Sequence, residues 1–77
     1  MRTFADIVSN LKLETTSAED IHLTYEMVAS PDQYEHVTQD DKMMLLQLMV
    51  AYSQETDREE KKMISRAFDN LLNEKFR

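Results

Sequence analysis

The residue types best suited to metal chemistry in this sequence lie together in the segment Glu19-Asp20-Ile21-His22. A Glu-x-x-His spacing on a helix places a carboxylate and an imidazole on one face, as in carboxylate-bridged di-iron bundles. Such a site needs a second copy of the motif and further glutamates, and this chain has one copy, so two chains of a dimer would each have to supply one. We therefore predict no metal site, and we expect Glu19 and Asp20 to stabilise the first turn of a helix.

Groups for covalent or phosphate chemistry are equally sparse. The two imidazoles, His22 and His36, stand in no spacing that is typical of a nucleophile with its base. The sequence has no Cys, which removes thiol nucleophiles, thiolate metal sites and disulfides together. It also has no Gly, which excludes glycine-rich phosphate loops. We therefore expect a protein that is not an enzyme and uses no cofactor.

The net charge of −6 is unevenly distributed along the chain. Residues 1–41 contain two bases and nine acids, a net −7, whereas residues 42–77 contain seven bases and six acids, a net +1. Direct binding to nucleic acid is not expected, because it needs clustered Lys and Arg. The paired acids are Glu19 and Asp20, Asp32 and Glu35, and Asp40 and Asp41. Either they stabilise the N-termini of helices, or they converge on one face that binds a basic partner.

The absence of Gly and the single Pro leave few tight turns, so the elements that position these residues are expected to be helices. Polar start signals precede each apolar repeat, at Thr3, Ser17, Thr38 and Thr56. Ser30-Pro31 is a further start signal for a short turn. We predict one all-α domain over 1–77, a small bundle with helices at about 4–12, 18–29, 39–53 and 57–76 and a short helical turn near 31–37.

The apolar pattern within these helices predicts which sides face the core. In the second helix the expected inward stripe is Ile21, Tyr25 and Val28. In the last helix it is Ile64, Ala67, Phe68 and Leu71. Phe76, near the end of that helix, either folds back onto the domain or packs on a neighbouring chain.

The helix at 39–53 is apolar on more than one side. Nine of the ten residues from Met43 to Tyr52 are apolar, with Gln47 the exception. One stripe contains Leu45, Leu48, Met49 and Tyr52, and a second contains Met43, Leu46 and Val50. Either this is a central helix that the others surround, or the second stripe is an interface, for which flexible Met side chains are suited.

This apolar run is also about half the ~20 residues that span a bilayer. The chain start does not resemble a signal peptide, because an Asp lies in the first turn and no long apolar core follows. We therefore expect a cytoplasmic protein that does not bind membranes.

These patterns together favour a non-enzymatic, acidic protein-binding module, a homodimer that regulates or inhibits a protein partner. Small acidic helical proteins of this composition are typical of phages and other mobile elements. The expected partner-binding acids are Glu19, Asp20, Asp32, Glu35, Asp40 and Asp41, and the expected apolar interface residues are Met43, Leu46, Val50 and Phe76. Two alternatives stay open: a DNA mimic that occupies the DNA site of a nucleic-acid-binding protein, and a small structural subunit or assembly factor.

Overall fold

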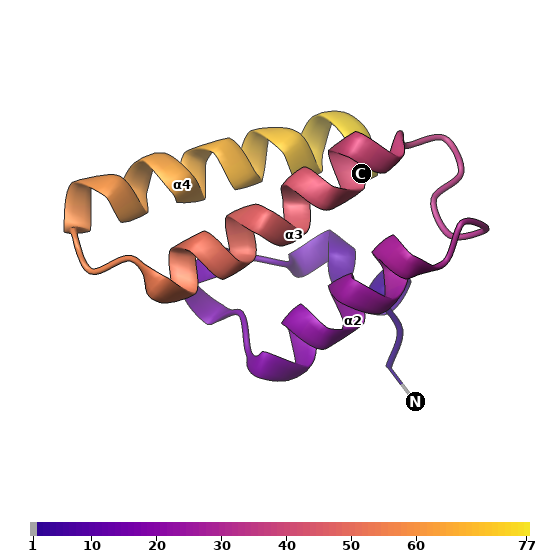
Figure 1. Ribbon diagram of the computed structural model, residues 1–77, viewed down its shortest axis with the longest axis horizontal. Helices are drawn as coiled ribbons and strands as arrows, with labels where there is room; N and C mark the ends of the chain where they lie inside the picture. The colour runs from indigo at the N-terminus through magenta and orange to yellow at the C-terminus, as the bar shows by residue number, and fades with distance from the viewer. Residues whose placement is uncertain (1) are drawn as a thin grey trace.

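The computed structural model describes residues 2–77, and over these residues the fold is all-α with no strand. Three long helices account for most of the chain: α2 (Ala18–Ala29), α3 (Gln39–Gln54) and α4 (Arg58–Leu71). A short N-terminal segment precedes them, with α1 (Phe4–Ile7), η1 (Val8–Asn10) and η2 (Leu13–Thr15). After α4 the chain continues into a π-helical turn, η3 (Leu72–Phe76). The prediction of a small all-α bundle is confirmed (Figure 1).

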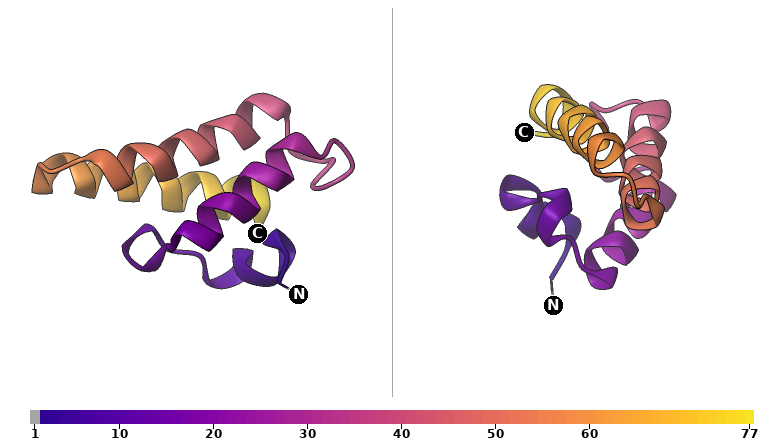
Figure 2. Two further views of the ribbon diagram at one scale, coloured as in Figure 1. Left: turned by 60° about the horizontal axis from the view of Figure 1, so that its bottom comes forward. Right: turned by 90° about the vertical axis from the view of Figure 1, so that its left-hand side faces the viewer.

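The three long helices follow one another back and forth, with α3 between α2 and α4 (Figure 1). The N-terminal segment lies on the other side of the core, where α1 contacts α2 and η2 contacts α4 (Figure 2). The described residues measure 36 × 24 × 19 Å along their principal axes. Helix α3 is therefore one wall of the bundle rather than its centre, and one of its sides is left without a covering helix.

The start of α2 agrees with the prediction because the chemistry that begins a helix is local. The Ser17 hydroxyl accepts a hydrogen bond from the Asp20 N–H at 3.2 Å, and the Asp20 carboxylate accepts one from the Ser17 N–H at 3.2 Å. This capping box satisfies two backbone donors that have no partner inside the helix. At α3, the Thr38 hydroxyl accepts from the Asp41 N–H at 3.2 Å. The predicted ranges 18–29 and 39–53 are confirmed to within one residue.

The first and last helices differ from the prediction at their ends. The α-helical part of the first ends at Ile7 and tightens into η1, so the helix stops short of residue 12. The last helix begins at Arg58, because the carboxylate of Asp57, and not the hydroxyl of Thr56, accepts the capping hydrogen bond from Glu59 N–H. Helical structure then continues to Phe76, as predicted, although its final turn is wider.

The connection between α2 and α3 is irregular and contains no helix. Two hydrogen-bonded turns follow each other here, with Gln33 N–H donating to Ser30 O at 3.2 Å and Val37 N–H to Tyr34 O at 2.9 Å. Tyr34 has a φ of 53°, in the left-handed region that interrupts a right-handed helix. The ammonium group of the buried Lys42 donates to the Gln33 carbonyl and ties this loop to α3. The predicted short helical turn near 31–37 is therefore corrected to a pair of turns.

Helix α2 is rotated relative to its predicted stripe of Ile21, Tyr25 and Val28. Tyr25 is 60% exposed, and Ile21 and Val28 are only partly buried. The buried residues of α2 are Asp20, Leu23, Thr24 and Met27. Two of these are polar, and they are buried because their groups are hydrogen-bonded: the Thr24 hydroxyl donates to Asp20 O at 2.9 Å. A prediction from apolar spacing places such polar residues on the exposed side of the helix. It therefore gives the wrong orientation for α2.

Side-chain contacts join the N-terminal segment to the last helix. The hydroxyl of the buried Ser65 donates to the Glu14 carboxylate at 2.8 Å, linking α4 to η2. The Arg77 guanidinium donates to Val8 O at 3.0 Å and to Leu11 O at 3.2 Å. These bonds satisfy carbonyls at the irregular end of η1 and hold both ends of the described chain against the same core.

The Glu14 contact predicts a specific pH dependence of stability. The backbone N–H of Glu14 and the Ser65 hydroxyl both donate to its carboxylate, and they hold the pKa of this group below its ordinary value of 4.5. A lowered pKa in the folded state stabilises the fold above the ordinary pKa, and this stabilisation is lost as the pH falls through the lowered value. We expect the stability advantage of the wild type over Glu14→Gln to shrink between about pH 6 and about pH 3.

Urea unfolding of both proteins at a series of pH values measures this difference. Glu74→Gln, at an exposed position near the end of the chain, is the control and should leave the pH profile unchanged. Parallel profiles for the wild type and Glu14→Gln would contradict the assignment.

Candidate functional site

Helix α3 has one buried and one exposed apolar side. Leu45 and Met49 lie in the core, and Leu48 and Tyr52 pack against it. On the other side Met43 is 46% exposed and Val50 is 37% exposed, with Leu46 half-buried beside them. The two stripes predicted from the sequence thus differ in burial: the first lies in or against the core, whereas Met43 and Val50 of the second are exposed.

Tyr25 of α2 is 60% exposed, although the sequence pattern assigned it to the inward stripe of that helix. It lies four residues after Ile21 and three before Val28, so all three share one side of α2. Helix α2 contacts α3 near both ends of this stripe: Ile21 lines a small cavity with Met49, and Gln39 Nε2 donates to Val28 O at 2.9 Å. Tyr25 lies between these two contacts along α2 and has an exposed aromatic ring. We call Tyr25, Met43, Leu46 and Val50 the α2–α3 surface.

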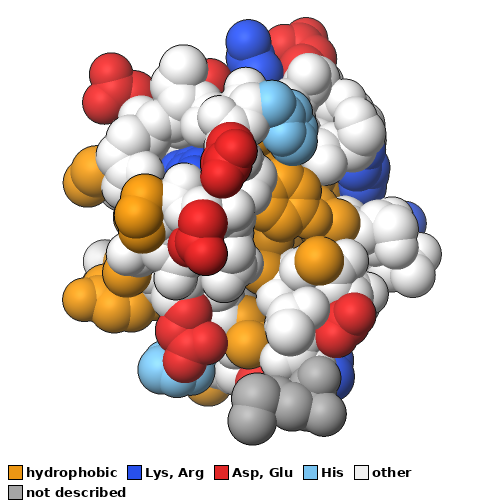
Figure 3. All heavy atoms as spheres, turned by 90° about the vertical axis from the view of Figure 1, so that its right-hand side faces the viewer, with side chains coloured by type: hydrophobic (Ala, Val, Ile, Leu, Met, Phe, Trp, Pro, Cys, Tyr) orange, Lys and Arg blue, Asp and Glu red, His pale blue; other side chains and the backbone are white. Residues whose placement is uncertain are grey.

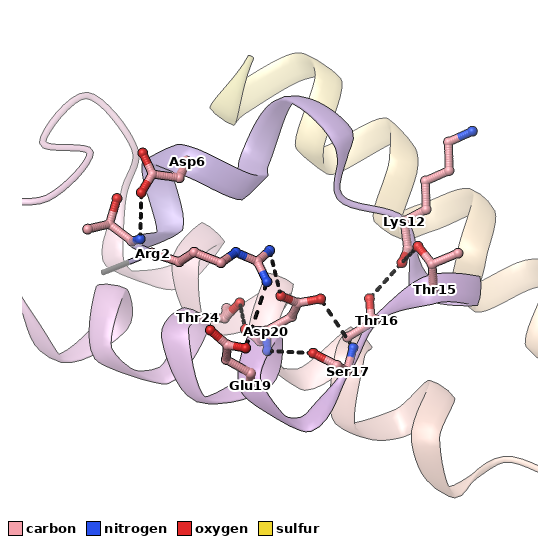
Figure 4. Close-up of polar contacts among 10 residues, drawn as sticks. Arg2, Asp6, Lys12, Thr15, Thr16, Ser17, Glu19, Asp20 and Thr24 are labelled. Carbon is pink, nitrogen blue, oxygen red and sulfur yellow. Dashed lines mark hydrogen bonds and ion pairs between the residues drawn. The ribbon is translucent and has the colours of Figure 1, made fainter.

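Two of the predicted acids, Glu19 and Asp20, belong to a structural cluster at the start of α2 (Figure 4). Asp20 is buried, and its carboxylate accepts hydrogen bonds from Ser17 N–H and, at 3.4 Å, from Arg2 Nη2. Glu19 is exposed, and its carboxylate lies 3.7 Å from Arg2 Nη1. The assignment of Asp20 to a partner-binding face is therefore corrected, because its carboxylate is already used inside the domain.

The other four acids gather at the opposite end of α2. Asp32 and Glu35 lie in the connection to α3, where they surround a shallow depression together with Tyr34 and His36. Asp40 and Asp41 follow in the first turn of α3. The end-on view of this region shows acidic side chains down its middle, with hydrophobic side chains to their left and a hydrophobic area to their right (Figure 3). The six predicted acids therefore form two groups, one at each end of α2. The group of four, in the connection and in the first turn of α3, precedes Met43 of the α2–α3 surface in the chain.

Phe76 does not contribute to any exposed surface. It is 4% exposed and its ring lies 5.9 Å from that of Phe4 and 5.6 Å from that of Tyr34, measured between centroids. Of the two alternatives, the side chain folds back onto its own domain. Its assignment to an apolar interface is corrected for this reason.

Two of the residues considered for metal or catalytic chemistry, His22 and Glu19, are in contact with other charged side chains. The His22 imidazole lies 2.9 Å from the Glu26 carboxylate one turn along α2, while Glu19 is paired with Arg2. His36 is exposed, with its ring 5.8 Å from that of Tyr34. Within residues 2–77 no three His, Asp or Glu side chains are grouped so that they could hold a metal ion. We therefore take the α2–α3 surface as the candidate functional site.

Comparisons with known protein families, with curated protein sequences and with solved structures give no match to this chain. None of the helices described over residues 2–77 is both long enough and apolar enough to cross a bilayer.

Proposed function

We propose that this chain acts by binding a protein partner, which it regulates or inhibits, and that the α2–α3 surface is where the partner binds. The observation that carries the proposal is the exposure of Met43 and Val50 on a helix that buries Leu45 and Met49 in the core. Exposed apolar side chains that adjoin one another on a small domain are typical of interaction sites. Met suits such a site, because its unbranched side chain adapts to the shape of a partner.

The neighbouring acids favour a protein partner over the site of a DNA-binding protein. A DNA mimic presents carboxylates in place of phosphates, and the phosphate backbone has no counterpart to an apolar stripe such as Met43, Leu46 and Val50. In contrast, protein interfaces combine an apolar centre with a polar rim. We therefore favour a regulator or inhibitor of a protein, while the homodimer expected from the sequence stays a prediction.

Site-directed photo-crosslinking tests this proposal. Gln47 is exposed on α3 between Met43 and Val50, and Arg66 is exposed on α4. We expect a photoreactive residue at position 47 to crosslink one discrete partner protein in cells, and the same residue at position 66 to give no such product. The identified partner, once purified, should change its activity when the wild-type chain is added.

The double variant Met43→Ser/Val50→Ser serves as the loss-of-binding form and should abolish both the crosslink and the effect on activity. Equal crosslinking from positions 47 and 66, or an unchanged effect of the double variant, would rule out the α2–α3 surface as the binding site.

A further inference from the structure

The charge distribution around the α2–α3 surface indicates what kind of partner segment it takes. Resting on the function proposed above, we propose that the surface binds one basic amphipathic helix of the partner protein. The apolar side of that helix would pack on Tyr25, Met43 and Val50, and its Lys and Arg side chains would face the surrounding acids.

The surface has the length and the composition that a helix needs. Helix α3 has 16 residues and so is about 24 Å long, which matches about four turns of a helix lying along it. From Met43 to Gln54 the sequence contains no charged residue, so the centre of the surface is apolar or neutral along three turns. Tyr25 widens it onto α2 and supplies an aromatic ring, the residue type that contributes most to interface energy. Amphipathic helices bind to such surfaces through apolar side chains at helical spacing.

Acids predominate among the charged residues of α2, of the α2–α3 connection and of the first turn of α3. Residues 18–54 contain seven acids and one base. Glu19 and Asp20 are paired with Arg2 at the start of α2, so the acids that concern the surface are Glu26, Asp32, Glu35, Asp40 and Asp41. The one base, Lys42, is buried and its ammonium donates to the Gln33 carbonyl, so it is not exposed to repel the Lys and Arg side chains of a partner directly. Asp40 and Asp41 lie at the start of α3 and Glu26 lies next to Tyr25. A partner segment with Lys and Arg along its edges complements this pattern, and one with acids does not.

The same charges act against a second copy of this chain as the occupant. Two copies that meet through the α2–α3 surface would bring two sets of acids together, Asp40 and Asp41 among them, and like charges facing each other oppose association. Salt screens that repulsion and would strengthen a dimer, whereas it would weaken the binding of a basic helix. The direction of the salt dependence therefore distinguishes the two occupants.

Fluorescence anisotropy of the full chain with designed helical peptides tests the proposal. The probe is a labelled amphipathic peptide of about 16 residues with Leu on one side and Lys on the other, which matches the length of α3. One control peptide has Glu in place of Lys, and another has the same Leu and Lys in an order that forms no apolar side. We expect saturable binding of the amphipathic Lys peptide, with at least about tenfold weaker binding of both controls.

Two pairs of matched variants locate the binding. Met43→Ser/Val50→Ser should weaken binding of the probe about tenfold. Met63→Ser/Ala67→Ser on α4 should change affinity less than about twofold, because both positions are exposed, Ala67 contrary to the inward stripe expected from the sequence. Asp40→Asn/Asp41→Asn should weaken binding of the probe by a similar factor at low salt. The difference in affinity from the wild type should shrink at high salt. The control for charge is Glu59→Gln/Glu60→Gln, which also removes two acids from the first turn of a helix. Thermal melts of all variants verify that they are folded.

Each result has a definite consequence. Equal losses from the α3 and α4 variants, or equal affinity for the Lys and Glu peptides, would overturn the proposal. The proposal would also be overturned if the chain binds none of the peptides and forms a dimer whose affinity increases with salt. If the peptide fails but the crosslink from position 47 is retained, the basic helix is excluded and the proposed binding function stands. If neither peptide binding nor the crosslink from position 47 is observed, the proposed binding function is excluded as well.

Discussion

Replacing Phe76 by Ala is expected to destabilise the fold by about 3–5 kcal/mol, the range for deleting a buried aromatic side chain. The Phe76 ring closes a triangle with Phe4 and Tyr34, whose own centroids are 5.4 Å apart in an edge-to-face arrangement. Aromatic pairs of this geometry contribute about 0.5–1.5 kcal/mol beyond burial. A domain of this size has a free energy of unfolding of about 4–12 kcal/mol, so the loss is a large part of the total.

Thermal and urea unfolding measure the effect, and the melting temperature should fall by about 4–8 °C for each kcal/mol. Phe76→Leu keeps an apolar side chain in the same space and should cost much less. Met63→Ala, at a position on α4 that is 63% exposed, should stay within about 0.5 kcal/mol of the wild type. A stable Phe76→Ala protein that had lost partner binding would instead support a place for Phe76 on an interface.

The contacts among Phe4, Tyr34 and Phe76 are a feature of the fold that could not be predicted from the sequence. Helix starts depend on a few neighbouring residues, such as Ser17 with Asp20, and these could be predicted. The position of Phe76 depends on Phe4 and Tyr34, which come from the opposite end of the chain and from the irregular loop before α3. No periodicity within one helix carries that information, because contacts between distant segments arise only when the whole bundle packs.

The candidate surface was predicted in part for a related reason. The two apolar stripes of α3 are a property of one helix, so Met43 and Val50 could be separated from Leu45 by spacing alone. Tyr25 could not be placed, because the orientation of α2 depends on burying Thr24 and Asp20. Those two side chains become acceptable in the core only through hydrogen bonds, and one of those bonds comes from Arg2 in a different segment. Buried polar groups with satisfied partners are thus the main source of error in assigning the inner side of a helix.

The one-sided burial of α3 leads to the second large expected effect, a contrast between two substitutions in one helix. Leu45 is fully buried, so Leu45→Ala should cost about 2–5 kcal/mol through lost burial and the cavity that remains. Met43→Ala removes a side chain that is already 46% exposed and should change the free energy of unfolding by less than about 0.5 kcal/mol. Both replacements introduce the residue with the highest helix propensity, so the difference between them reports on packing.

Urea unfolding of the two variants, with binding of the Lys peptide measured in parallel, decides how α3 is used. Met43→Ala should bind the Lys peptide more weakly while its free energy of unfolding stays close to that of the wild type. The folded fraction of Leu45→Ala should bind the Lys peptide with wild-type affinity. If Met43→Ala were as destabilised as Leu45→Ala, α3 would be surrounded on both sides within its own domain. The apolar stripe would then have a structural role, and the acids near the start of α3 would be the remaining candidates for partner binding.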